Sequence, residues 1–266
     1  MKKQCAIVFD FDETIGHFIQ PYNFWYNLKK FLNDETLDEN YFHSFLDLFP
    51  NYFRTNIFKI FKFLKKKKIS GQCNFVAIYT NNNGPSFWIN IIKSYIHKKL
   101  KYNLFDQIIR AYKINGRVIE ENRTSYKKSH SDLLNCTKLS YTTQICFIDD
   151  QYHTDMNHKN VFYIYIQPYI YNIDYNIICS KYFNKNIELF KKYNKNQEEF
   201  SKYLFDLKNN TIKNENKSQL QKNIDFLISK KIEHDIKKFF NKNTRKTIKT
   251  IKNKNHTKNN QTRKFE

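Results

Sequence analysis

The segment that decides the fold is CAIVFDFDET, which spans residues 5–14. Its first five residues are continuously apolar, which is typical of a strand buried on both faces of a parallel sheet. Polar residues follow at once, with Asp10 and Asp12 two positions apart and Thr14 two further on. The segment therefore predicts a buried strand that ends in two carboxylates.

Three later runs, at 75–79, 144–148 and 161–166, share this short apolar character. Helical patterns lie between the runs. In residues 57–64, for example, apolar side chains recur at i, i+3, i+4 and i+7, the spacing of an amphipathic helix. Strands that alternate with helices predict an α/β fold whose mainly parallel sheet is flanked by helices.

Two parts of the chain depart from this alternation. Residues 22–49 show aromatic-rich helical patterns and predict a helical insertion, or small cap, after the first strand. The C-terminal part predicts a helical extension over 181–240 and a basic, disordered tail over 241–266. The α/β domain itself is expected to span 1–180.

The net charge of +21 is concentrated near the C-terminus, since residues 181–266 contribute +14 of it. This charge favours weak nucleic-acid contact through the basic tail. However, the abundance of Asn, Lys and Ile resembles that of proteins from AT-rich genomes, so codon usage explains part of the charge. No apolar run approaches the roughly 18 residues of a membrane span, and the five cysteines are widely spaced. We therefore expect no membrane partner, and reduced thiols in an intracellular protein.

Polar side chains follow three of the predicted strands. In an open parallel sheet, ligands bind beyond the carboxyl ends of the strands, so these side chains should meet at one edge. Crowded carboxylates repel one another, and a divalent cation with a preference for oxygen ligands, such as Mg²⁺, relieves that repulsion. The residues are Asp10, Asp12, Thr14, Thr80, Asn81, Asp149 and Asp150.

These residues resemble the motifs of the haloacid dehalogenase (HAD) superfamily. Asp10-Phe-Asp-Glu-Thr14 is similar to its DxDxT motif, Thr80 to its second, Lys128 before a helix to its third, and Asp149-Asp150 to its fourth. The motifs occur in order within residues 4–170. The resemblance implies a HAD-like Rossmannoid sheet.

Within the superfamily, residues 10–17 (DFDETIGH) resemble the DLDETLVH signature of the polymerase-tail (CTD) phosphatase-like group, also called NLI-interacting-factor-like. Residues 105–109 and 112–116 look most like small HAD-type proteins of large DNA viruses. A viral source would place the protein in the host cytoplasm or the virion, and a cellular one in the cytoplasm or nucleus. The fourth motif of the cellular group reads Asp-Asn, so the Asp-Asp pair here leaves open which acid contacts the metal.

The resemblance implies a role for each matched residue. Asp10 would be the nucleophile that forms an aspartyl-phosphate, and Asp12 the general acid and then base. Lys128 would neutralise charge on Asp10 and the phosphate, with Lys127 as the alternative lysine. The implied phosphate-binding residues are Thr14, Thr80, Asn81 and Lys128, and the implied Mg²⁺ ligands are Asp10, Asp12 (through its backbone carbonyl), Asp149 and Asp150.

The resemblance thus implies a Mg²⁺-dependent phosphomonoester hydrolase, with phosphoserine or phosphothreonine in protein as the expected substrate. Two alternatives stay open. A nucleic-acid 3′-end phosphatase is suggested by the Thr80-Asn81 loop, which resembles the TNQ turn of that branch. A non-catalytic binding module with the HAD fold is the other.

Overall fold

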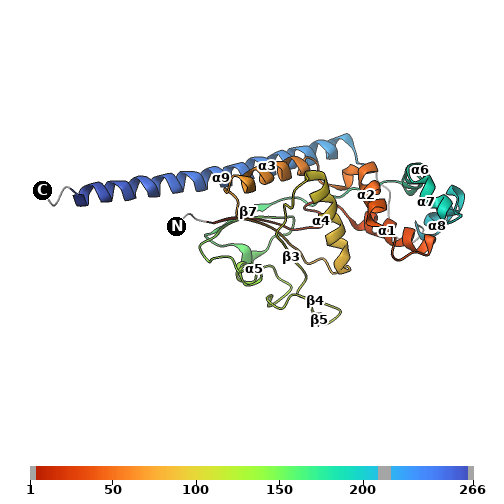
Figure 1. Ribbon diagram of the computed structural model, residues 1–266, viewed down its shortest axis with the longest axis horizontal. Helices are drawn as coiled ribbons and strands as arrows, with labels where there is room; N and C mark the ends of the chain where they lie inside the picture. Colours follow the sequence, from red (N-terminus) through yellow and green to blue (C-terminus); the bar gives the residue numbers. More distant parts are fainter. Residues whose placement is uncertain (1–3, 209–216, 263–266) are drawn as a thin grey trace.

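The computed structural model describes residues 4–208 and 217–262, and it contains a five-stranded parallel sheet (Figure 1). The strand order is β3-β2-β1-β6-β7. β1 is the central strand, and its Ile7 pairs with Val76 of β2 on one side and Cys146 of β6 on the other. The bounds are β1 Cys5–Phe9, β2 Phe75–Tyr79, β3 Gln107–Ile109, β6 Gln144–Asp149 and β7 Val161–Tyr165.

Helices cover both faces of this sheet, so the predicted α/β fold is confirmed. Alternate residues of β1 point to opposite faces: Ile7 and Phe9 pack in the larger core with α3 and α4, whereas Ala6 and Val8 pack with α5. These helices are α3 Ile57–Ile69, α4 Ser86–Leu100 and α5 His130–Thr137. The strand β3 and a small antiparallel hairpin, β4 Lys113–Ile114 with β5 Arg117–Val118, complete this region.

A helical segment follows β1, as expected for residues 22–49, and it packs against helices from much later in the chain. Phe24 of α1 stacks on Phe45 of α2 with ring centroids 4.3 Å apart, and contacts Tyr182 of α6 and Phe200 of α8. The two segments therefore share one apolar core. The helices are α1 Ile19–Leu32, α2 Glu39–Leu48, α6 Tyr175–Lys185, α7 Ile187–Lys192 and α8 Gln197–Lys208, with short 3₁₀ turns at Pro50–Tyr52 and Thr154–Met156.

The inserted helices leave and rejoin the α/β domain at one point. Gly16 forms an antiparallel bridge with Phe53, and the backbone N–H of His17 donates to the carbonyl of Tyr52. A Cβ atom on Gly16 would lie 2.4 Å from that carbonyl oxygen, so the close approach of the two strands requires glycine.

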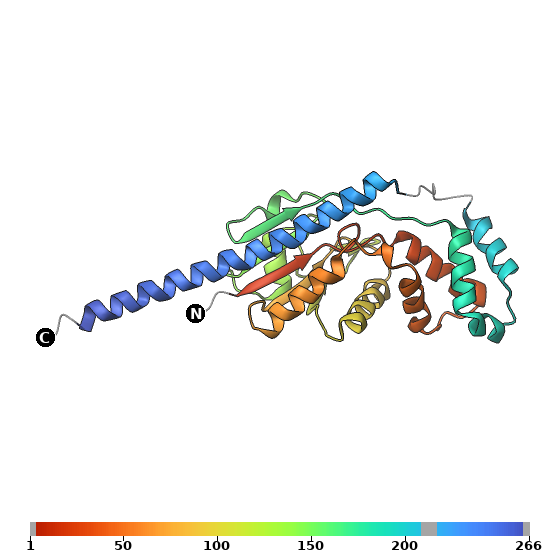
Figure 2. The same ribbon diagram turned by 90° about the horizontal axis from the view of Figure 1, so that it is seen from above.

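The last helix is α9 Gln219–Thr262, whose first part lies over the sheet beside α3 and whose C-terminal part extends beyond the α/β domain (Figure 2). Ile236 and Phe239 are buried, Phe240 packs edge-on against Phe63 of α3, and Glu233 pairs with Lys59 at 3.1 Å. The helix continues into the range whose composition predicts disorder, and residues 263–266 lie outside the described part. The division into 1–180, 181–240 and 241–266 stays a prediction. None of the described helices is long and apolar enough to cross a membrane.

The packing of α9 predicts that it contributes to stability. We expect Ile236→Ala to lower the free energy of unfolding by about 2–5 kcal/mol, because it leaves a cavity in the core. Leu227→Ala, on the same helix but 65% exposed, should change it by less than about 0.5 kcal/mol. Urea unfolding of both variants tests this, and equal effects would show that α9 is not docked.

Candidate functional site

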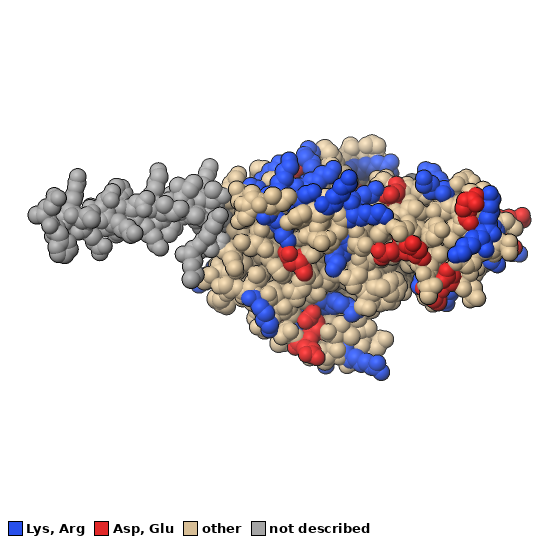
Figure 3. All heavy atoms as spheres, in the orientation of Figure 1, with Lys and Arg blue, Asp and Glu red and all other residues tan. Residues whose placement is uncertain are grey.

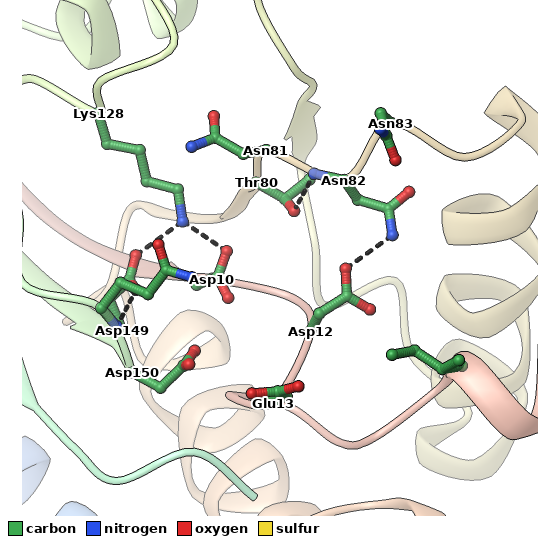
Figure 4. A pocket seen from close by; sticks show the side chains of 12 residues that line it. Asp10, Asp12, Glu13, Thr80, Asn81, Asn82, Asn83, Lys128, Asp149 and Asp150 are labelled. Atoms are coloured by element: carbon green, nitrogen blue, oxygen red, sulfur yellow. Dashed lines mark hydrogen bonds and ion pairs between the residues drawn. The ribbon is translucent and has the colours of Figure 1, made fainter. Parts of the chain in front are cut away.

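A polar pocket of about 370 Å³ lies at the carboxyl ends of β1, β2 and β6 (Figure 4). It forms there because three neighbouring parallel strands all end at this edge. Most of the candidate residues line it, so the structure brings together groups far apart in sequence. The lining residues are Asp10, Asp12, Glu13, Ile19, Thr80, Asn81, Asn82, Asn83, Lys128, Asp149, Asp150 and Gln151.

Three carboxylates form the centre of the pocket. Asp10, Asp149 and Asp150 each offer an oxygen, and these oxygens all lie within 4.8 Å of one another. The ammonium of Lys128 donates to Asp10 Oδ1 at 2.5 Å and to Asp149 Oδ2 at 2.7 Å. A buried acidic triad of this kind can hold a metal ion, and its hard oxygen donors suit Mg²⁺.

The local sequence positions Lys128 at the start of α5. Ser129 caps the helix, and its side chain accepts a hydrogen bond from the backbone N–H of Asp132. Lys128 precedes this cap and is only 2% exposed. Lys127, the alternative lysine, is exposed at the surface. The structure therefore places Lys128 rather than Lys127 between the carboxylates.

Burial and local contacts together make the ionisation of Asp10 and Asp149 unequal. It raises the pKa of Asp10 from 3.8 to about 7, against the lowering effect of Lys128 and with a further increase from Asp149. Burial also raises the pKa of Asp149, but contacts with His153, Lys128 and the Gln151 backbone N–H outweigh it, and that pKa falls below its ordinary value. A cation beside Asp10 would therefore favour its ionised form.

Asp12 lies apart from the triad, on the other side of the pocket. Its Oδ2 accepts a hydrogen bond of 2.7 Å from the side-chain amide of Asn82. The oxygen of that amide accepts from the backbone N–H of Gly84, so the NH₂ group is the end that faces Asp12. Burial raises the pKa of Asp12, which favours its protonated form. Of the four predicted metal ligands, Asp12 is the one whose carboxylate is outside the triad.

Sequence reasoning missed Asn82, although a signal was present. Asn82 stands two residues before Gly84 and two after Thr80. Asn often accepts a hydrogen bond from the backbone two residues further on, as it does here. Its own backbone N–H donates to Thr80 Oγ1 at 2.9 Å. The turn thus links the predicted phosphate-binding threonine to the carboxylate of Asp12.

Two predicted phosphate-binding side chains are engaged elsewhere. The hydroxyl of Thr14 donates to Asp150 Oδ1 at 2.8 Å and accepts from the Asp150 backbone N–H, and Thr14 does not line the pocket. The amide of Asn81 lines it, but accepts from Arg123 and donates to the carbonyl of Tyr126. Thr14 therefore supports Asp150 of the acidic triad, and Asn81 joins two loops.

Comparison with known proteins finds no matching family model, no matching curated protein and no matching solved structure. The protein itself has an α/β fold with a buried acidic triad at the edge of its parallel sheet.

The raised pKa of Asp10 predicts how the stability of the metal-free protein depends on pH. The unfolded chain loses this proton near pH 3.8 and the folded chain near pH 7. The folded state is therefore progressively penalised as pH rises from about 4 to about 7. Relative to wild type, Asp10→Asn should gain stability over this window, by up to about 4 kcal/mol.

The measurement is chemical unfolding of wild type and Asp10→Asn from pH 4 to 8 in the presence of a chelator. The difference between the two proteins removes the contribution of His17 and His130 to the pH dependence. Their pKa values are lowered by burial, so their contribution to stability increases as pH rises, opposite to that of Asp10. A difference that does not change with pH would contradict the assignment. Added Mg²⁺ should stabilise wild type more than the variant, because it binds a carboxylate that the variant lacks.

Proposed function

We propose that this protein is a HAD-type, Mg²⁺-dependent phosphomonoester hydrolase that acts through an aspartyl-phosphate on Asp10. The observation that carries the proposal is the Lys128 ammonium held between Asp10 and Asp149, in a pocket that Asp12 and Thr80 also line. An anionic phosphoryl group needs such a cation beside its nucleophile, because catalysis here depends on positioning and charge neutralisation.

The order of motifs on the sheet supports the HAD assignment. The central strand β1 ends just before Asp10, β2 on one side ends just before Thr80, and β6 on the other side ends at Asp149. Lys128 enters from the loop before α5. Motifs separated by more than a hundred residues thus form one pocket, as the resemblance implies.

In the first step, a carboxylate oxygen of Asp10 attacks phosphorus and the bond from phosphorus to the ester oxygen breaks. That oxygen takes a proton from Asp12, whose raised pKa suits an acid. Lys128 stabilises the negative charge that gathers on Asp10 and the phosphoryl group. Splitting the displacement in two in this way is the general advantage of a covalent nucleophile.

In the second step, Asp12 accepts a proton from water, and the water oxygen attacks phosphorus. The bond to Asp10 breaks, which releases phosphate and restores the carboxylate. The amide of Asn82 would hold Asp12 in place through both steps. Mg²⁺, held by carboxylates of the triad, would supply charge neutralisation for Asp10 and the phosphoryl oxygens.

The charges of the pocket support a single phosphoryl group on a protein side chain. Among its lining residues Lys128 is the one Lys or Arg, and the others around it are acids, amides, Thr80 and Ile19. A nucleic-acid end carries further phosphates, for which this lining offers no second cation. Phosphoserine or phosphothreonine in protein therefore remains the preferred substrate, and the 3′-end phosphatase the alternative.

We expect wild type to release phosphate from p-nitrophenyl phosphate only when Mg²⁺ is present. Asp10→Asn should reduce turnover by at least about 10³-fold, because it removes the nucleophile. Lys127→Met is the matched control, since it removes an exposed lysine next to Lys128 and should retain turnover. Full activity in Asp10→Asn would contradict the proposed nucleophile. A folded wild type inert toward all phosphoesters would favour the binding module.

The same assay with two further substrates separates the enzyme alternatives. A phosphoserine peptide should be hydrolysed faster than a 3′-phosphorylated oligonucleotide of similar size. Preference for the oligonucleotide would assign the protein to the nucleic-acid alternative.

We also propose that the protein contacts nucleic acid through a basic surface. Lys and Arg side chains gather over α3 and the adjacent part of α9 (Figure 3). α3 alone contains six lysines, and Lys62, Lys66 and Lys238 are exposed. The sequence predicts this contact for the basic tail at 241–266, whose side chains beyond Lys242 lie outside the described residues. The lysines over α3 and α9 extend the proposal to the folded domain.

Changing Lys62, Lys66 and Lys238 together to Glu should reduce the magnitude of the negative slope of log affinity against log salt by about 3. This is one unit for each lost phosphate contact. Fluorescence anisotropy with a short DNA duplex measures it. The same change at Lys181, Lys185 and Lys202, which are exposed on α6 and α8, is a control of equal net charge. Equal losses in both triple variants would show that net charge, not this surface, attracts the duplex.

A further inference from the structure

Two arginine side chains are almost fully buried, do not line the pocket and have no role in the reaction described above. Arg54 is 1% exposed and Arg123 is 2% exposed. A buried guanidinium is costly unless its donors are satisfied. Most of their hydrogen bonds go to backbone carbonyls of segments that carry pocket residues, although Arg54 Nη1 and Arg123 Nε have no partner among the described residues. Their burial therefore has a structural purpose next to the site.

Arg54 holds the loop that follows Asp12. Its Nε donates to the carbonyl of Thr14 at 2.7 Å, and its Nη2 donates to the carbonyls of Glu13 at 2.5 Å and Gln167 at 2.8 Å. Glu13 has a φ of 58°, a left-handed conformation that a non-glycine residue rarely adopts without support. One guanidinium therefore stabilises a strained turn directly after the DxD segment.

This turn is linked to the acidic triad, the proposed metal site. The residue whose carbonyl Arg54 binds, Thr14, uses its hydroxyl to hold Asp150 Oδ1 and the Asp150 backbone N–H. Asp150 belongs to the acidic triad. A displacement of the turn would therefore move Asp150 relative to Asp10 and Asp149, and it would change the site at which a cation binds.

Arg123 supports the other side of the pocket, which is lined by Thr80 and Asn81. Its Nη1 donates to the carbonyls of Thr80 at 3.1 Å and Arg110 at 2.7 Å, and its Nη2 donates to Asn81 Oδ1 at 2.8 Å and the carbonyl of Tyr126 at 3.1 Å. Tyr126 lies two residues before Lys128. Arg123 thus joins the end of β2 to the segment that brings Lys128 into the pocket.

We propose that Arg54 and Arg123 are positioning residues with separate effects: Arg54 sets the geometry for the metal ion, and Arg123 sets the geometry for the phosphoryl group. This inference rests on the proposed function. Arginine suits both positions, because its planar group of five donors reaches several carbonyls at once, whereas a lysine ammonium cannot reproduce that fork.

The experiment compares Arg54→Lys with Arg123→Lys, and each variant is the control for the other. Mg²⁺ affinity is measured by calorimetry on the substrate-free protein, and inorganic phosphate is measured as an inhibitor of p-nitrophenyl phosphate hydrolysis at saturating Mg²⁺. Arg54→Lys should weaken Mg²⁺ binding by about 10-fold or more, as loss of outer-shell support does, and leave phosphate inhibition within about twofold. Arg123→Lys should weaken phosphate inhibition by about 10-fold or more and leave Mg²⁺ affinity within about twofold.

Both substitutions will cost stability, so stability alone decides nothing. Parallel losses of Mg²⁺ and phosphate affinity in both variants would overturn the proposal and assign the arginines to general folding. If Arg54→Lys does not fold, Thr14→Val breaks the same link at Asp150, and normal Mg²⁺ affinity in that variant would equally overturn it. A wild type that binds Mg²⁺ and phosphate but hydrolyses nothing would refute the proposed function alone, with phosphate affinity then measured directly by calorimetry.

Discussion

The contact of the Lys128 ammonium with Asp10 and Asp149 is the constraint on which the arrangement of the site depends. All three side chains are almost fully buried, and none would be tolerated there alone, since an unpaired buried charge costs several kcal/mol. Asp10 and Lys128 are 118 residues apart in sequence. The pair therefore requires the tertiary fold, which brings the end of β1 and the segment before α5 together.

The strained turn at Glu13 and the loop after β2 depend on a second layer of buried charge. Arg54 and Arg123 donate to carbonyls of the segments that carry pocket residues but do not line the pocket, whose one Lys or Arg is Lys128. This separation matters because a guanidinium within the pocket would compete with a metal ion for the carboxylates. The site thus keeps its negative charge at the acidic triad, where a cation could bind.

The periphery shows a similar dependence on distant segments. α1 and α2 bury their aromatic side chains against α6 and α8, so the insertion after β1 and the C-terminal part form one helical unit. α9 then returns along the sheet beside α3, where Ile232 and Ile236 are buried. Within the described part of the chain, residues of the C-terminal third as far as Phe240 are therefore also part of the folded core.

The sequence by itself determined the buried strands, their alternation with helices, and the polar residues at the strand ends, because apolar runs and helical spacing are local signals. It could not identify Asn82, Arg54 or Arg123 as parts of the site, and it did not show that Thr14 faces Asp150 rather than the pocket. Those facts depend on which loops meet. Only the tertiary structure decides that. The contacting residues come from segments far apart in the sequence, and no periodic pattern indicates which of these segments will meet.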